Sequence, residues 1–371
     1  MKIDQVKTKN ELIEFVKFPF KLYKESKYWV PPIIKEEVNS FTKGVNPNLD
    51  DCDVNLYVAK SKSKIVGRIA IIINWYEVNN QKIKKVRFGW FDFIDDLKVS
   101  KALLQKAGDI CKKNNLDFLE GPIGFSNLDK VGVLTSGFKE ISTMISWYNY
   151  PYYKNHFENL NFSVEKEYLE NKFNFKNIDI DYYERMSLIV QKRFDLKPVS
   201  FNSTNKVLEF ADQMFELFNI TYSKLASFIP VNQKQINYMK DKFLSFINPE
   251  YLKFVLDKDN KLIGFAVIMP SFAKALQKAN GSLFPFGFLH LLHAKRFPKN
   301  VTLFLIGVHP DFQKKGVTAI LFNSLLQSLK DKGIKECIRT AELKDNFEIS
   351  RLWKNFNPVT YKTRCTYKKN I

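Results

Sequence analysis

The sequence predicts an α/β protein built from two tandem copies of one unit, and three observations support this. NLYVAKSKSKIVGRIAIIIN in the first half is similar to YLKFVLDKDNKLIGFAVIMP in the second, with Gly67 and Gly264 at the same place. After each copy the patterns follow the same order: a buried strand, a helix, a strand, a helix and a final strand. A chain of 371 residues also suits two domains. The alternative is two unrelated hairpins that share a turn.

Hydrophobic periodicity and turn residues predict the elements of the first copy in order. A helix begins near residue 10, the Pro31-Pro32 pair interrupts it, and a second helix follows. Residues 121–137 read as loop-rich. The remaining predicted elements are two strands within 56–74, a strand at 82–93, a helix at 99–113, a strand at 117–121, a helix at 152–160 and a strand at 162–175.

In the second copy, VTLFLIGVHPDFQKKGVTAILFNSLLQSLKDK (301–332) predicts a buried strand, a basic turn and an amphipathic helix. Pro310 ends the strand, and Gly333 ends the helix. The start of a helix presents unpaired N–H groups and a partial positive charge, which suit a phosphate. Gly316 permits close backbone approach, and Lys314 and Lys315 add charge. The alternative is an ordinary strand-to-helix connection with solvated lysines.

The same residues, LIGVHPDFQKKGVTAILF, resemble the pyrophosphate loop of the GNAT superfamily of acyl-CoA N-acyltransferases. Gln313 and Gly316 fit the pattern, whereas Thr318 departs from its last Gly or Ala. KECIRTAELKDNFEISRLWKNFNPVTYKTRCTYKK resembles the fifth strand, fourth helix and closing strands of that family. The resemblance covers roughly residues 200 to 371. Over the full chain, KFPFKLYKESKYWVPP, GRIAIIIN, FGWFDF and YNYPYY resemble a bacterial double-GNAT group.

The resemblance implies two GNAT-like domains, each a mixed, mostly antiparallel twisted sheet flanked by helices. We expect a degenerate domain at 1–175 and an acyl-CoA-binding domain at 176–371, with an insert at about 271–299. The turn of the first copy has no Gly, Gln or Arg, and Asp95 and Asp96 stand there. Two carboxylates repel a phosphate and serve better as helix N-caps. Only the second copy is therefore expected to bind coenzyme A.

The resemblance also implies site residues. The donor is acyl-CoA as a co-substrate, and its pantetheine arm would lie along Ile306, Gly307 and Val308, with Asn346 beside it. Its diphosphate would meet Gln313, Lys314, Lys315, Gly316, Val317 and Thr318. Glu342 is the candidate base, with a surface or capping carboxylate as the alternative. Trp353 stands near the position of the usual Tyr acid of the family, and Tyr361 is a weak substitute.

Charge is uneven along the chain, whose formal net charge is +19. Residues 1–170 carry 26 Lys and Arg against 22 Asp and Glu, whereas residues 171–371 carry 32 against 17. The insert has no acidic residue and combines Lys274, Lys278, Lys295, Arg296 and Lys299 with Phe and Leu. Such a composition is typical of an interfacial membrane segment, or of a cap on an acyl channel. The alternative is a helical insert that packs on the other copy.

Other features of the sequence limit the possible compartments and cofactors of the protein. Four scattered cysteines without a CxxC indicate a reducing compartment and core thiols. His290 and His293 share a helix face but lack a third ligand, so no metal is expected, and His309 is taken as structural. There is neither a signal-peptide pattern nor an apolar run long enough to span a membrane. We expect a cytoplasmic protein, in one version peripheral at the inner face of the membrane.

The sequence therefore predicts transfer of an acyl group from a coenzyme A thioester to an amine, with a lipid or long-chain amine as a refinement. The alternative is a non-catalytic GNAT-fold protein that binds an anionic membrane surface or nucleic acid through its basic half. For nucleic acid there is charge but no recognition motif. Coenzyme A binding would separate the two readings.

Overall fold

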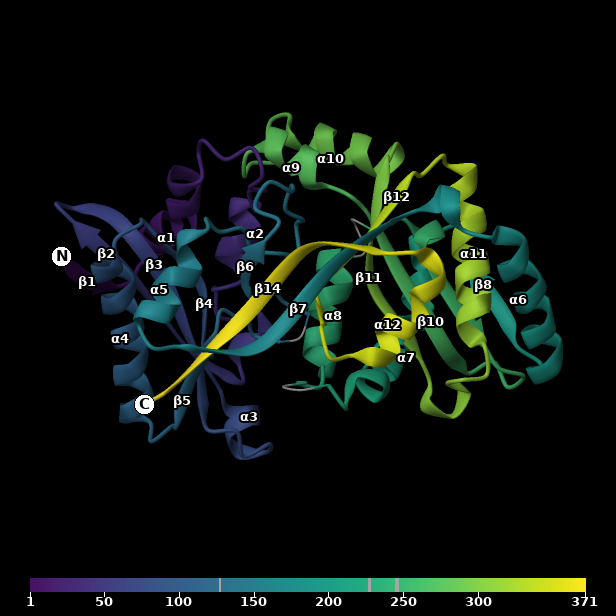
Figure 1. Cartoon of the computed structure of the whole chain (residues 1–371), viewed down its shortest axis with the longest axis horizontal. Helices are drawn as coiled ribbons and strands as arrows, with labels where there is room; N and C mark the ends of the chain where they lie inside the picture. Colours follow the sequence, from purple (N-terminus) through teal and green to yellow (C-terminus); the bar gives the residue numbers. More distant parts are fainter. Residues whose placement is uncertain (127, 226–227, 244–246) are drawn as a thin grey trace.

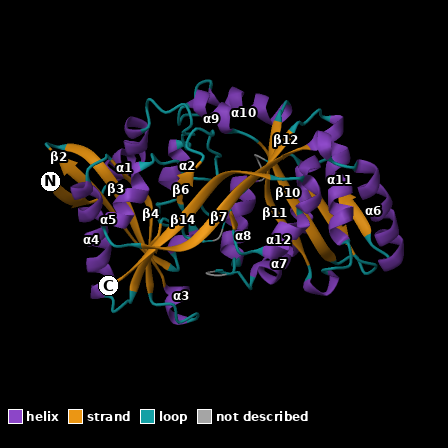
Figure 2. Ribbon diagram, viewed as in Figure 1, coloured by secondary structure: helices purple, strands orange, loops and turns teal. Residues whose placement is uncertain are grey.

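Two α/β units lie side by side and share one 14-stranded sheet (Figure 1). The computed structural model describes residues 1–126, 128–225, 228–243 and 247–371. Figure 2 shows helices packed against the strands in both units. The first unit contains β1 (Lys2–Gln5), α1 (Lys9–Leu22), α2 (Ile34–Asn39), β2 (Cys52–Ser61), β3 (Lys64–Asn74), α3 (Trp75–Asn79), β4 (Lys85–Phe93), α4 (Leu97–Lys113), β5 (Phe118–Gly121), β6 (Val133–Ser136), α5 (Tyr152–Asn159) and β7 (Ser163–Asn174).

The second unit repeats this order and adds an insert between its third and fourth strands. Its elements are α6 (Ile180–Phe194), β8 (Lys197–Ser200), α7 (Thr204–Tyr222), α8 (Gln233–Phe243), β9 (Leu252–Leu256), β10 (Leu262–Pro270), α9 (Ala273–Ala279), α10 (Gly287–Arg296), β11 (Asn300–Val308), α11 (Val317–Asp331), β12 (Glu336–Arg339), β13 (Glu342–Leu343), α12 (Phe347–Leu352) and β14 (Val359–Asn370). The predicted tandem α/β fold is confirmed. β6, within the stretch read as loop, was missed.

The two units exchange their last strands. The strand order is β1-β2-β3-β4-β5-β14-β7-β12-β11-β10-β9-β8, so β14 from the end of the chain lies beside β5, and β7 lies beside β12. In Figure 1, β7 and β14 cross the middle of the molecule as a pair. Each is a long strand of 12 residues, antiparallel to the other. The predicted boundary after residue 175 falls directly behind β7, but the sheet continues across it.

The repeated glycines have the same packing role in both units. Gly67 pairs with Phe93, and Gly264 pairs with Val308. A Cβ atom on Gly67 would lie 2.8 Å from Val99 of α4, and one on Gly264 would lie 3.2 Å from Val317 of α11. In each unit the glycine therefore lets the helix after the fourth strand cross close to the sheet. The internal repeat read from the sequence is confirmed.

The insert has one packed helix and one exposed helix. The α9 side packs on the first unit: Gln277 Nε2 donates to the Trp29 carbonyl at 2.8 Å, and the Ile34 N–H donates to the Gly281 carbonyl at 2.9 Å. In α10 only Leu291 is buried. Large apolar side chains around it are exposed, namely Phe284, Phe286, Phe288, Leu289, Leu292 and Phe297. The packing that the sequence left as the alternative is present in α9, whereas a role of the insert at a membrane or over an acyl channel stays a prediction.

Thiols are part of the core, as predicted. Cys52, Cys111, Cys337 and Cys365 are all free and buried. Burial raises the pKa of Cys52 and of Cys337 to about 12, so these thiols are protonated at neutral pH. They act as small apolar residues rather than as nucleophiles.

Candidate active site

The fourth and fifth strands of the second unit separate halfway along their length. β11 pairs with β12 in parallel only from Asn300 to Leu303, whereas β11 stays paired with β10 as far as Val308. Beyond Leu303, β12 ends at Arg339 and the next strand, β13, pairs with β7 instead. Val267 pairs with Leu305 and Ile268 with Leu303, so Phe304 is a bulged residue. The bulge marks the point where the two strands part.

The edge of β11 beyond the bulge turns its main-chain groups toward this separation. The Tyr222 hydroxyl donates to the Ile306 carbonyl at 3.1 Å and accepts from the Ile306 N–H at 3.4 Å. Gln313 Nε2 donates to the Val308 carbonyl at 3.1 Å. The His309 N–H donates to Ile263 on the β10 side. Side chains, rather than a neighbouring strand, therefore meet Ile306 and Val308, where main-chain bonding to a ligand arm was predicted.

The predicted phosphate turn is at the surface. Gln313, Lys314 and Lys315 are exposed, and Gly316 is half-buried. Gly316 has φ +81°, and Val190 of α6 would lie 2.8 Å from a Cβ there, so glycine is required. Gly316 is the N-cap of α11 without a side-chain cap. The first N–H groups of α11, from Val317 and Thr318, have no acceptor within the helix.

Glu342 forms a close ion pair with Arg339 near the same separation. Arg339 Nε donates to Glu342 Oε1 at 3.0 Å, and the second nitrogen of the guanidinium contacts Oε2. The guanidinium also lies 4.8 Å from the ring centre of Trp353. Burial raises the pKa of Glu342 above its ordinary value, although Arg339 opposes the shift. Burial raises the pKa of Tyr222 to about 12, and the charge of Glu342 adds to this.

Two predicted residues have other contacts. The Tyr361 hydroxyl donates to Glu170 at 3.1 Å, inside a buried cluster with Lys362 and Arg364 on β7 and β14. Burial raises the pKa of Tyr361 far above its ordinary value, and the negative charge of Glu170 raises it further. Asn346 is the N-cap of α12 and accepts from the Ile349 N–H at 3.3 Å. The charge of Glu342 thus acts on Tyr222, which bonds to Ile306 of β11, whereas Tyr361 points at Glu170.

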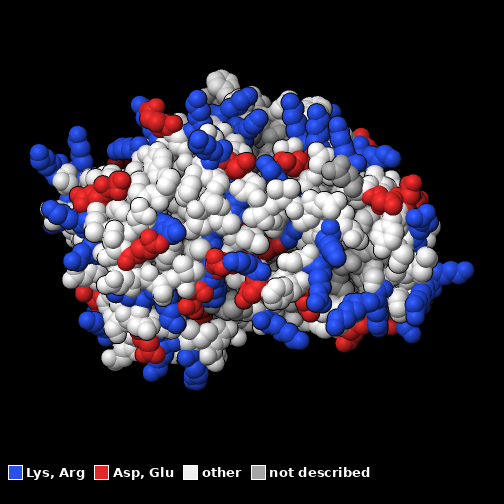
Figure 3. Space-filling model, in the orientation of Figure 1, with Lys and Arg blue, Asp and Glu red and all other residues white. Residues whose placement is uncertain are grey.

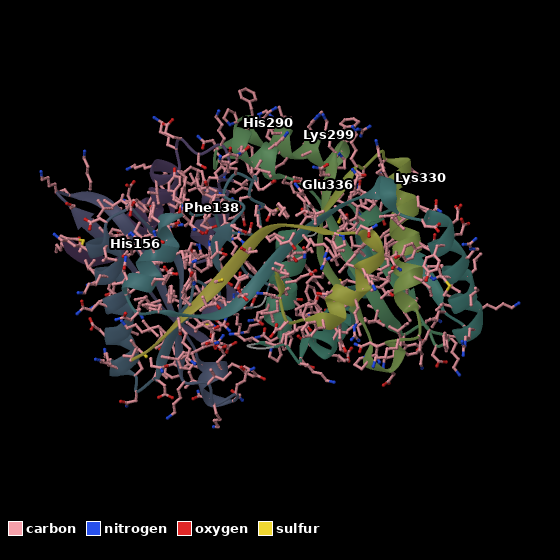
Figure 4. All side chains as sticks on the ribbon, in the orientation of Figure 1. Phe138, His156, His290, Lys299, Lys330 and Glu336 are labelled. Carbon is pink, nitrogen blue, oxygen red and sulfur yellow. The ribbon has the colours of Figure 1, made fainter. Side chains whose placement is uncertain are left out.

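Tyr222 is the site residue that the sequence analysis missed. It ends α7, 84 residues before Ile306 in the chain, and nothing in the surrounding FNITYSKL marks it as functional. The remaining candidates stay structural: His309 accepts from the Asp311 N–H at 3.3 Å. Figure 4 shows His290 on the outer helix α10, well away from His156. Among the described residues, no group of three or more His, Cys, Asp or Glu side chains could hold a metal ion.

The equivalent space in the first unit is filled by its own chain. β4 and β5 also pair only at their starts, from Lys85 to Arg87. The Ile123 N–H then donates to the Phe88 carbonyl at 2.8 Å, and Arg87 Nη1 donates to the Gly124 carbonyl at 3.0 Å. Residues 122–125 thus occupy the separation.

The helix start of the first unit is closed as well. The Asp96 side chain caps α4 by accepting from the Lys98 N–H at 2.9 Å. The Asp95 carboxylate lies 2.9 Å from His156 Nε2, and Nδ1 of the same ring lies 2.8 Å from Ser100 Oγ. Ser100 is completely buried, so this Ser-His-Asp chain ties α4 to α5 rather than presenting a nucleophile. The predicted capping role of Asp96 is confirmed.

Comparisons with known proteins agree with this geometry. Residues 211–356 match the Acetyltransferase (GNAT) family. Protein YghO of Escherichia coli (strain K12) is 26% identical over 373 residues, covering 98% of this chain and 94% of that protein. A protein named bacterial ceramide synthase from Caulobacter vibrioides (strain NA1000 / CB15N) is 22% identical over 381 residues, covering 99% and 96%.

Solved structures share the fold over the whole chain. A tandem GNAT protein from the clavulanic acid biosynthesis pathway superimposes with a TM-score of 0.59 at 10% identity, covering 100% of this chain and 98% of that one. A GCN5-related N-acetyltransferase from Sphaerobacter thermophilus gives a TM-score of 0.53 at 7% identity, covering 99% and 95%. At the general level these findings support an acyltransferase. Residues 211–356 thus match the GNAT family, and the whole chain has the fold of a tandem GNAT protein.

Proposed function

We propose that the protein transfers an acyl group from acyl-CoA to an amine, at the second unit. The observation that carries this is the unpaired edge of β11 next to the uncapped, lysine-flanked start of α11. GNAT proteins in general use a coenzyme A thioester and an amine. A flexible arm with amide groups suits a free strand edge, and a diphosphate suits a helix start.

The donor would be held in two parts. Its diphosphate would accept from the N–H groups of residues 316–318, with the ammonium groups of Lys314 and Lys315 beside it. Its pantetheine arm would lie along Ile306 to Val308. The Tyr222 hydroxyl now uses the Ile306 hydrogen bonds, so binding there would replace these bonds and release the hydroxyl. Asn346, at the start of α12, would lie beside the arm.

The chemistry needs one proton removed and one supplied. The amine nitrogen attacks the thioester carbon, the carbon–sulfur bond breaks, and the thiolate leaves. Glu342, with its raised pKa, is the proposed base for the amine proton. Tyr222, once released from Ile306, is better placed than Tyr361 to protonate the sulfur, because Tyr361 is held by Glu170. The Val308 N–H is the proposed donor to the thioester carbonyl.

Coenzyme A titration followed by calorimetry and thermal melting tests the donor site. We expect binding of one coenzyme A per chain. Lys314→Glu with Lys315→Glu should weaken it about tenfold or more, since each loses a cation beside the diphosphate. The control is Lys330→Glu with Lys335→Glu, the same charge change at exposed positions in the last turn of α11 and just after it. Absence of binding by the wild-type chain would refute the proposal.

For the acceptor we propose an amine that carries a long apolar chain. The support is the similarity to a protein named a ceramide synthase, together with the exposed apolar surface of the insert. Competition among amines of equal head group, from ethylamine to dodecylamine, tests it in a transfer assay. A preference for the short amine would contradict this substrate class.

We further propose that α10 binds an anionic membrane surface. Phe284, Phe286 and Phe297 are 79%, 69% and 60% exposed. Figure 3 shows Lys and Arg gathered along the upper edge of the molecule, over α9 and α10. Exposed aromatic rings among cations suit an interface with acidic lipids. Within the described residues, no helix is long and apolar enough to span a membrane, so binding would be peripheral.

Flotation with vesicles of phosphatidylglycerol and phosphatidylcholine tests this surface. The variant Phe284→Ser, Phe286→Ser should lose most vesicle binding. Leu188→Ser, Ile189→Ser is the matched control, because these α6 side chains are 62% and 57% exposed but lie outside the insert. Equal binding by the two variants would contradict a role for the exposed apolar side chains that flank α10. Binding to duplex DNA instead of vesicles would favour the nucleic-acid alternative.

A further inference from the structure

An apolar cavity lies beside the proposed site, on the α7 and α8 face of the second sheet. Its empty volume is about 560 Å³, part of it open to solvent. Only Lys240 among its lining residues is not apolar. Val207, Ala211 and Met214 of α7 form one wall, and Phe304 and Leu305 of β11 form another. A hollow that opens to solvent and is lined by apolar side chains has the character of a ligand pocket.

The cavity begins where β11 separates from β12. Phe304 is the bulged residue, and the bulge places both Phe304 and Leu305 on the α7 side of the sheet. The next residue, Ile306, is the one whose main chain is bonded to Tyr222. A group that leaves the proposed reaction centre on this side therefore meets apolar side chains at once.

At the corresponding position of the first unit stands a large aromatic side chain. Trp90 lies three residues before Phe93, as Leu305 lies three before Val308. Its ring packs against Phe41, Phe125 and Trp147, with ring centres 4.7, 5.4 and 5.5 Å away. In the first unit, aromatic side chains thus occupy the position at which the second unit has the cavity.

The mouth of the cavity is polar. Lys240 Nζ lies 2.7 Å from Asp212 Oδ1, and the Asp212 side chain is 58% exposed. The alkyl stem of Lys240 therefore lines the cavity while its charged end lies at the surface. Apolar walls with a charged rim suit a chain that enters from water.

We propose that this cavity binds an unbranched hydrocarbon chain of a substrate. The inference rests on the proposed acyl transfer and adds the place where the chain is held. The chain belongs either to the acyl group of the donor or to the amine, and both share the chemistry that these walls recognise. Burial of each methylene removes apolar surface from water and strengthens binding about fourfold.

Calorimetry with the full chain tests this in two arms below micellar concentrations. The first compares coenzyme A with its acetyl, hexanoyl, decanoyl and dodecanoyl thioesters. The second titrates n-alkylamines of six to twelve carbons into protein saturated with coenzyme A. We expect affinity to rise steadily with chain length in one arm, and that arm identifies the source of the chain.

Variants that fill the cavity should remove this dependence. Ala211→Phe, and independently Val207→Phe, should level the affinities along the series and leave binding of coenzyme A itself unchanged. Leu208→Phe is the control, because the neighbouring Leu208 is 38% exposed and does not line the cavity. Unchanged coenzyme A affinity shows that a variant is folded.

The outcomes separate the two proposals. Coenzyme A binding without any chain-length effect in either arm overturns the cavity proposal and leaves the proposed function standing. A chain-length effect that survives both filling variants also overturns it. Chain binding without coenzyme A binding overturns the proposed function alone, and absence of both overturns both.

Discussion

The two strand separations of this molecule have the same origin and opposite contents. In the first unit, pairing of β4 with β5 ends after Arg87, and residues 122–125 fill the space. In the second, pairing of β11 with β12 ends after Leu303, and only side chains meet the edge at Ile306 and Val308. The comparison teaches that strand pairing ends early in both units, and that the first unit fills the separation with its own main chain whereas the second does not.

Charge at the helix starts follows the same division. Asp96 caps α4, and Asp95 pairs with His156. Lys314 and Lys315 flank the uncapped start of α11. A carboxylate of the protein and a bound phosphate can each stabilise the positive end of a helix. The first unit thus supplies a carboxylate of its own at the helix start, where the second unit has none.

Among the variants that test the difference between the two units, Glu342→Gln should have the largest effect, because it removes the proposed base of the second unit. Loss of the base should lower kcat about 10²- to 10⁴-fold while coenzyme A affinity stays the same. Because the pKa of Glu342 is raised, wild-type activity should fall with decreasing pH already above the ordinary value of 4.5, as the carboxylate becomes protonated. A pH profile of kcat/KM measures this.

The control for this change is Glu348→Gln, an exposed carboxylate in the first turn of α12. It should leave kcat and the profile unchanged. If Glu342→Gln retains full activity, Glu342 only holds Arg339 in place.

Glu77→Gln should show that the first unit contributes to the stability of the fold rather than to coenzyme A binding. Glu77 pairs with Arg87 and, at 2.8 Å, with Lys85, all in the core. Removing one charge of a buried cluster costs about 3–5 kcal/mol of the free energy of unfolding. Coenzyme A affinity per folded molecule should not change. Urea unfolding followed by circular dichroism measures the loss.

The sign of its pH dependence follows from the pKa of Glu77. Burial opposes ionisation, but Arg87 and Lys85 overcome this and lower the pKa below the ordinary 4.5. The stabilisation is therefore present at neutral pH and is lost as the pH falls through the lowered value. The difference between wild type and variant should shrink in acid. A constant difference would contradict a role of the Glu77 charge.

Local patterns predicted much of this molecule. The apolar run before Pro310 is β11, Gly316 begins α11, and Gly67 and Gly264 mark the repeat. Each of these depends on residues close in sequence, where periodicity and glycine conformations decide the outcome.

What the sequence could not predict depends on distant contacts. β7 and β14 were both recognised as closing strands, but their exchange depends on which strand edges meet. Tyr222 reaches Ile306 across 84 residues, and the filling of the first separation depends on where 122–125 return to β4. No period or motif records such pairings.

Gly316→Asp should give the second unit the carboxylate of the first. The new charge faces the diphosphate, and its Cβ would meet Val190 at 2.8 Å. Charge-assisted hydrogen bonds are worth about 1.5 kcal/mol or more each, so we expect coenzyme A affinity to fall about tenfold or further. Gly316→Asn is the control, because it meets the same contact with Val190 and the same positive φ without the charge. Equal effects of the two variants would mean that strain, not charge, is measured.

Asp96→Gly combined with Asp95→Asn tests whether the two carboxylates or the chain at residues 122–125 exclude coenzyme A from the first unit. Its effect should be the smallest. Because glycine is itself tolerated as an N-cap, loss of the Asp96 cap should lower the free energy of unfolding by only about a few tenths of a kcal/mol, measured by thermal melting. The stoichiometry of coenzyme A should stay at one per chain, because Ile123 still bonds to Phe88 and the chain still fills the separation. A second equivalent of bound coenzyme A would show that the two carboxylates alone excluded it. One equivalent assigns the exclusion to residues 122–125, and the difference between the units then lies in their chain paths rather than in their charges.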